Sequence, residues 1–170
     1  MLKRLLVFIT FALCFSVFAT SPKCDGEDCL AVVGFFDNAQ IIKNITAYLY
    51  EGSVKIDSVV VTSTKDFGFV LKRNKNYSVQ IVKEGFYQRM ITIKTDLPAD
   101  INATPLFVFE FEITLIPKKK GVDDFFMDFP IALIAYDAKA EKFMFSRKYT
   151  TQMQKELKKV ETQFKVRKSN

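Results

Sequence analysis

The side chains that could do chemistry in this chain are carboxylates, thiols and phenols, because its 170 residues contain no histidine. Without an imidazole, Ser-His-Asp and Cys-His nucleophilic sites are excluded, as are haem ligation by histidine and most catalytic zinc sites. The six glycines are scattered singly, so neither a dinucleotide-binding motif nor a phosphate-binding loop is present. We therefore expect a protein that is not an enzyme and that holds no cofactor and no metal.

Paired carboxylates offer the main catalytic alternative. Glu110 and Glu112 stand two residues apart in an alternating segment, so they share one face of a strand. Asp123 and Asp124 form a second pair. Two carboxylates suffice for a glycosidase, but the polar face of an amphipathic strand explains Glu110 and Glu112 equally well. A carboxylate-based glycan hydrolase is therefore kept only as an alternative.

Two cysteines lie in an acidic segment near the N-terminus, residues 20–29. Cys24 and Cys29 flank Asp-Gly-Glu-Asp, while the third cysteine, Cys14, lies in an apolar run upstream. An even pair in an exported chain favours a disulfide between Cys24 and Cys29. Two free thiols are the second interpretation. A metal site is the third, and it lacks the usual four ligands.

Tyrosines supply the candidate binding surface. Tyr48 and Tyr50 alternate with a set of apolar residues, so they share the opposite face of a strand, and Tyr87 follows in a turn. Glycans stack on such rings, and protein partners also bury them. Packing of the second sheet face inside the domain is the alternative interpretation of all three tyrosines.

The first nineteen residues have the layout of a secretory signal peptide. Lys3 and Arg4 precede an apolar run that is too short for a spanning helix, and small residues lead to a cleavage site after Ala19. We therefore expect export from the cytoplasm and no transmembrane span in the mature chain. The net charge of +6 includes Lys3 and Arg4, and the remainder is too mild to indicate a nucleic acid partner.

Residues 30–117 alternate apolar and polar side chains in short runs, most clearly over 107–115. This period of two is typical of strands with one buried face, and Gly34 marks a candidate bulge in the first of them. Turn residues separate the runs at 51–53, 72–76, 84–85 and 97–100. About seven such strands predict an all-β fold, a seven-stranded antiparallel sandwich.

The chain changes character after Pro117. Residues 118–149 begin with a basic hinge, and the segments 130–137 and 142–146 are suited to a β-hairpin. Over 150–170 the apolar residues recur at steps of four, three and four, which predicts an amphipathic helix. This helix either covers the sandwich or binds a partner through Met153, Leu157, Val160 and Phe164.

Part of the strand region resembles a known family, the transthyretin-like (prealbumin/Ig-like) sandwich of the carboxypeptidase regulatory domain. The shared features are an aromatic-flanked Gly68, Tyr77 opening a strand, and Lys-x-Gly followed by an aromatic residue, here Phe86 in place of tyrosine. The match covers residues 30–116. The sequence after Gly121 is similar to tails of such domains in exported envelope proteins of Bacteroidetes-type bacteria. The resemblance implies a scaffold or binding role and brings no catalytic residues.

Together these features predict a non-enzymatic exported module with a structural or binding role. Its expected partner is a protein or glycan of the cell envelope. A subunit of a larger envelope assembly is the first alternative, and the hydrolase that uses Glu110 and Glu112 is the second. The sequence does not indicate an oligomeric state.

Overall fold

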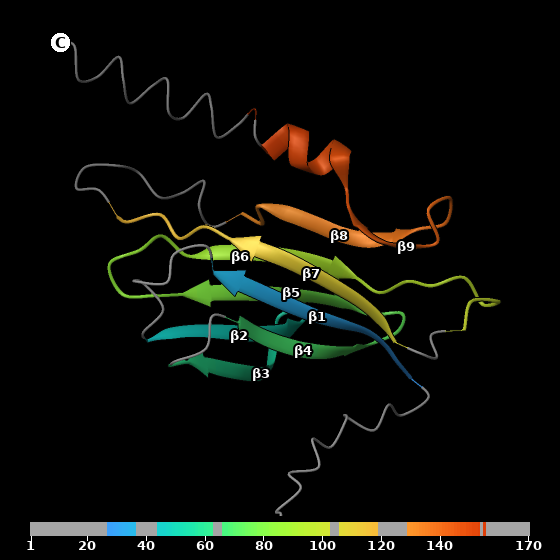
Figure 1. The fold of residues 1–170 in the computed structure, drawn as a ribbon, viewed down its shortest axis with the longest axis horizontal. Coiled ribbons are helices and arrows are strands. Elements are labelled where there is room, and N and C mark those ends of the chain that lie inside the picture. The colour runs from blue at the N-terminus through green and yellow to red at the C-terminus, as the bar shows by residue number, and fades with distance from the viewer. Residues whose placement is uncertain are drawn as a thin grey trace, which may run out of the picture.

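A computed structural model describes residues 27–36, 44–62, 66–102, 106–118, 129–153 and 155. This part of the chain contains nine strands and a short C-terminal helix at residues 147–153 (Figure 1). The strands are β1 (Asp28–Phe36), β2 (Ile45–Glu51), β3 (Val54–Val61), β4 (Asp66–Lys72), β5 (Asn76–Val82), β6 (Arg89–Lys94), β7 (Phe107–Ile113), β8 (Ala132–Asp137) and β9 (Lys142–Phe145).

The strands form two sheets that pack face to face. The smaller sheet has the order β4-β1-β7 and the larger has the order β3-β2-β5-β6-β8-β9. Figure 1 shows β1 and β7 crossing in front of β5 and β6. The prediction of a mostly β protein with two sheets and a C-terminal helix is confirmed.

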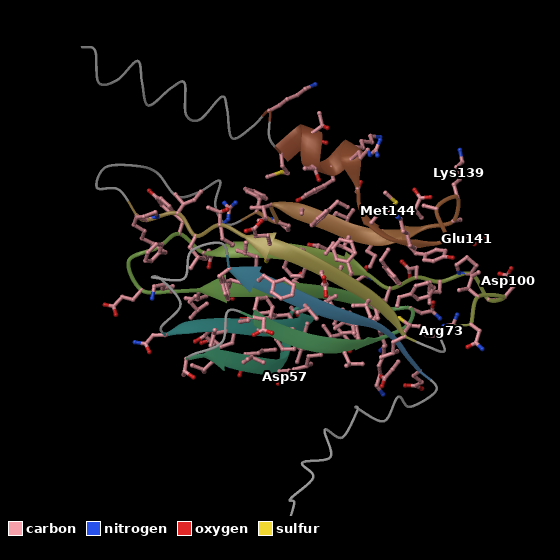
Figure 2. The ribbon with its side chains drawn as sticks, viewed as in Figure 1. Asp57, Arg73, Asp100, Lys139, Glu141 and Met144 are labelled. Carbon is pink, nitrogen blue, oxygen red and sulfur yellow. The ribbon has the colours of Figure 1, made fainter. Side chains whose placement is uncertain are left out.

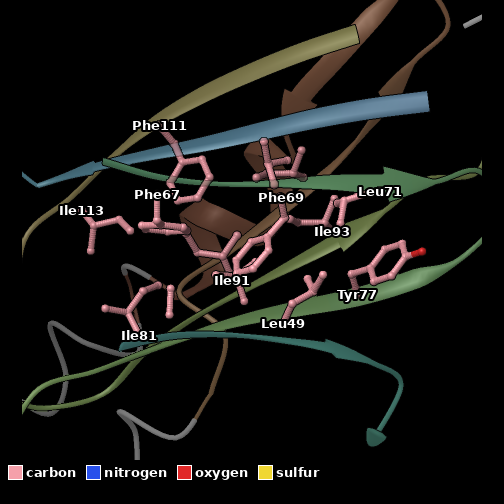
Figure 3. Close-up of a cluster of buried hydrophobic side chains, with 14 of the residues drawn as sticks. Leu49, Phe67, Phe69, Leu71, Tyr77, Ile81, Ile91, Ile93, Phe111 and Ile113 are labelled. Atoms are coloured by element: carbon pink, nitrogen blue, oxygen red, sulfur yellow. The ribbon is translucent and has the colours of Figure 1, made fainter. Parts of the chain in front are cut away.

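The core lies between the two sheets, where alternate residues of each strand point inward. In β4 the residues Phe67, Phe69 and Leu71 are buried while their neighbours are exposed. In β5 the buried residues are Tyr77, Val79 and Ile81. Figure 3 shows side chains from both sheets meeting in one cluster. Burial of this apolar surface is the main force that holds the sheets together.

The prediction of a purely antiparallel sandwich is wrong at two strand pairs. β1 pairs with β7 in parallel, with Ala31 opposite Val108, and β6 pairs with β8 in parallel. Side chains alternate with the same period in parallel and antiparallel strands, so the sequence pattern carries no information on direction. The parallel pairs join strands that lie far apart in the chain, and only the path of the connections decides their direction.

The β8–β9 hairpin suggested at residues 130–146 is present, but it is not a separate extension. β8 continues the larger sheet beyond β6, with Ile134 opposite Ile93. The Phe143 ring of β9 lies 5.5 Å from the Phe107 ring of the smaller sheet and 5.7 Å from Tyr136. The hairpin therefore contributes to the same core as the first seven strands.

Thr95 is a buried polar residue that closes one end of the sandwich. Its hydroxyl donates to the Lys72 carbonyl at 2.6 Å and accepts from the Lys75 amide at 3.0 Å. Beside this turn, Arg73 donates to the Pro98 carbonyl at 3.3 Å, and Figure 2 shows Arg73 and Asp100 at this end of the molecule. These bonds tie the β4–β5 turn to the segment after β6.

The C-terminal helix begins at residue 147, three residues earlier than predicted. Ser146 caps it by accepting a hydrogen bond from the Tyr149 amide at 3.4 Å, a capping signal that the apolar spacing did not reveal. The Tyr149 hydroxyl donates to the Pro130 carbonyl at 2.7 Å and holds the helix beside β8. Met153 is half-buried. The other three predicted interface residues lie outside the described residues: Leu157, Val160 and Phe164.

The described ranges contain no helix with the length and apolar character needed to cross a membrane. The predicted signal peptide, residues 1–19, lies outside them and stays a prediction.

Candidate binding site

The outward side of the larger sheet carries the two tyrosines that the sequence analysis singled out. Tyr48 and Tyr50 are half-buried on β2, which runs between β3 and β5. Tyr48 lies opposite Ser58 on β3 and Gln80 on β5. Cross-strand neighbours on one face lie within contact distance, so these side chains form a continuous surface.

A chain of hydrogen bonds fixes one of the two rings. The Tyr50 hydroxyl donates to Gln80 Oε1 at 3.1 Å, and Gln80 Nε2 donates to Gln88 Oε1 at 2.8 Å. These polar groups are part-buried, so each bond also satisfies a group that has lost some of its water. The ring is thereby held in one orientation, which lowers the entropy cost of stacking a ligand on it.

The other ring, that of Tyr48, lies beneath an ammonium group. Lys55 Nζ is 5.1 Å from the centroid of the Tyr48 ring, within the range of a cation–π contact. A register shift between Leu49 and Tyr50 brings about this contact, because it places Lys55 of β3 opposite Tyr50. The bulge therefore places the ammonium group of Lys55, on the edge strand β3, beside the two tyrosines.

We define the tyrosine face as the outward side chains of β2 with their partners on the two adjacent strands. Its members are Thr46, Tyr48, Tyr50, Lys55, Ser58, Val60, Ser78, Gln80 and Val82. The outward positions of β2, β5 and β6, in the part of the chain that the structure describes, include no carboxylate. Figure 1 shows the C-terminal helix beside β8 and β9, at the opposite edge of the sheet from β3. The face combines two aromatic rings with neutral hydrogen-bonding groups and one cation, and it ends in the two valines that flank Thr46.

Tyr87 does not belong to this face. Its side chain is 4% exposed, and its amide donates to the Ile116 carbonyl at 2.9 Å in the segment after β7. The structure thus brings together two of the three predicted tyrosines. Sequence reasoning missed Lys55, Gln80 and Gln88, because their position beside the tyrosines depends on strand register.

Cys29 lies at the start of β1, at an irregularity in the pairing with β4, and its side chain is fully buried. Burial raises the pKa of the Cys29 thiol from 9.0 to about 11, although the nearby Arg73 charge acts in the other direction. Cys24 lies outside the described residues, so the disulfide stays a prediction.

The raised pKa of Cys29 predicts a loss of stability at high pH in reducing buffer. The unfolded thiol loses its proton at lower pH than the folded one, so the free energy of unfolding should decline as pH rises from about 9 to 11. Urea denaturation of the reduced protein at several pH values measures this decline. Cys29→Ala removes the titrating group and should show a smaller decline. Equal pH profiles for the two proteins would reject a titrating buried thiol.

The carboxylate pair Glu110 and Glu112 is exposed on the outward side of β7. Two open pockets, of about 480 and 500 Å³, lie beside the C-terminal helix and the β8–β9 hairpin, and neither is lined by these glutamates. Asp123 and Asp124 lie outside the described residues. Within the described ranges, no group of three or more potential metal-ligating side chains converges.

No protein-family model matches this chain, and no curated protein matches it. Among solved structures, the crystal structure of S.CueP aligns with 55% of this chain at 13% sequence identity and a TM-score of 0.34. The aligned part spans 65% of the CueP chain. A likeness this slight carries no argument about fold or function.

Proposed function

We propose that this protein is a non-enzymatic exported module that binds a glycan of the cell envelope on the tyrosine face. The observation that carries the proposal is the pair of outward rings, Tyr48 and Tyr50, flanked by the hydrogen-bonded amides of Gln80 and Gln88. The C–H face of a sugar stacks on an aromatic ring, while its hydroxyl groups need donors and acceptors at the rim. The tyrosine face offers both, and the bonded amides hold the rim in place.

The signal-like first nineteen residues support export, and we place the protein in the periplasm or at the outer membrane. We also infer kinship with transthyretin-like sandwiches from the resemblance over residues 30–116. Seven strands between Asp28 and Ile113, divided over two sheets, are compatible with that kinship.

Removal of either ring should weaken glycan binding. A glycan array identifies an oligosaccharide that binds, and titration calorimetry then compares the native protein with Tyr48→Ala and Tyr50→Ala. We expect each substitution to weaken binding about tenfold or more, which corresponds to about 1.4 kcal/mol. Tyr50→Phe keeps the ring and removes only the bond to Gln80, so its loss should be smaller. The proposal fails if the alanine variants bind as tightly as the native protein while retaining its melting temperature.

Exposed apolar side chains on the edge strand β3 favour a second function, as a subunit of a larger envelope assembly. Val54, Ile56 and Val60 are 63%, 49% and 59% exposed. An edge strand of this kind can pair with a strand of another protein. Purification of one stoichiometric complex from native envelopes would support this function, and a clean monomer would count against it. Glu110 and Glu112 lie on an open sheet face away from both pockets, so we propose no hydrolase activity.

A further inference from the structure

We propose that the C-terminal residues 156–170 dock on the outward face of the smaller sheet. This inference is independent of the proposed glycan binding. We call this surface the small-sheet face; it consists of the outward side chains of its three strands: Ala31, Val33, Phe35, Asp66, Val70, Lys72, Val108, Glu110 and Glu112. Lys72 forms an ion pair with Glu27 at 3.0 Å.

One half of the small-sheet face is an apolar row across all three strands. Ala31 of β1 lies opposite Val70 of β4 on one side and opposite Val108 of β7 on the other. Val108 is 64% exposed and Val70 is 37% exposed, so the row is open to solvent. When another apolar surface covers such a row, apolar area is removed from water and the free energy of the system falls.

The other half is framed by carboxylates. Phe35 of β1 lies between Asp66 and Glu112, and Val33 lies between Gly68 and Glu110. Gly68 has no side chain, so no side chain projects from the sheet at that position between the acidic residues. The strand pairing thus places three carboxylates beside the apolar row, and a partner that covers both halves needs apolar and basic side chains together.

The chain's own C-terminal segment has this combination. Its apolar residues recur at helical spacing, and its other positions are rich in lysine and arginine. The apolar set is Leu157, Val160 and Phe164, which continues the spacing from Met153, and the basic set is Lys158, Lys159, Lys165, Arg167 and Lys168. The charge and the apolar spacing both complement the small-sheet face.

The hairpin that precedes the C-terminal helix lies at the edge of the smaller sheet. The Phe145 ring of β9 lies 5.1 Å from the Phe109 ring of β7, the edge strand of the smaller sheet. The C-terminal helix begins two residues after Phe145, at residue 147. A helix of fifteen residues is about 22 Å long and three strands span about 10–15 Å, so a segment of this length can match the width of the sheet.

Zero-length carbodiimide cross-linking of the full mature chain tests this inference. The reagent joins a carboxylate to an amine only where the two are in contact. An equal mixture of light and isotope-labelled protein separates links within one chain from links between two chains by mass. We expect links within one chain from Glu110 or Glu112 to Lys158, Lys159, Lys165 or Lys168.

A matched pair of variants provides the control. Val108 and Val60 are similarly exposed, at 64% and 59%, but only Val108 lies on the small-sheet face. Val108→Lys should reduce the yield of these links about tenfold or more, while Val60→Lys should leave it unchanged. Links between light and labelled chains alone would assign the face to a second copy and overturn the inference. Absence of the links, or equal yields in both variants, would also overturn it.

Discussion

Gly34→Ala is expected to lower the free energy of unfolding by about 3 kcal/mol, the upper end of the usual cost of overpacking a core. Gly34 lies on the inward side of β1, where a Cβ atom would stand 2.4 Å from Cζ of Phe67. Phe67 cannot easily move away, because its ring packs against Phe36 at 5.8 Å, Phe69 at 5.9 Å and Phe111 at 6.2 Å. Urea denaturation measures the change.

Two further variants separate this clash from a general intolerance of alanine in the sheet. Phe67→Leu shortens the side chain, so the double variant with Gly34→Ala should be more stable than the sum of the two single effects predicts. Gly68→Ala adds a methyl group on the outward side of β4, where the nearest atom is the Val32 carbonyl oxygen at 3.3 Å. This contact is less severe than the one at Gly34, so the destabilisation should be smaller than that of Gly34→Ala. A Gly34→Ala protein with unchanged stability would show that the core can absorb the methyl group.

Phe143→Ala should destabilise the whole protein by about 3–5 kcal/mol, the usual cost of removing a buried phenylalanine side chain. Phe143 is 4% exposed, and its ring contacts Phe107 of the smaller sheet and Tyr136 of β8. The loss should appear in one cooperative transition, because the β8–β9 hairpin shares its core with the other strands. Thermal denaturation followed by near-UV and far-UV circular dichroism measures it.

Phe145→Ala is the matched control for this prediction. Phe145 lies on the same strand but is 40% exposed, and its ring lies 5.1 Å from that of Phe109. We expect a loss of about 1 kcal/mol, in the range measured for single aromatic pairs. An early, separate transition in Phe143→Ala would mean that the hairpin folds as an independent unit. Equal losses for the two variants would contradict the difference in burial.

The sequence by itself determined where the strands lie and which side chains face inward. The buried set Phe67, Phe69 and Leu71 follows from alternation along one strand. This prediction succeeds because the alternation of side chains is a local property of extended backbone. The same argument applies to residues 107–113, whose pattern identified β7 without knowledge of its partner.

The tertiary structure alone decided how the strands are combined. Gly34 was expected to mark a bulge, but it pairs in register and its missing side chain makes room for the Phe67 ring. Tyr87 was grouped with Tyr48 and Tyr50 as a candidate binding surface, but it is buried near the segment after β7. Direction and register depend on contacts between residues far apart in the chain, and a period of two is the same for every register that differs by two residues. For that physical reason, the tyrosine face and the small-sheet face become visible only when the strands have been paired.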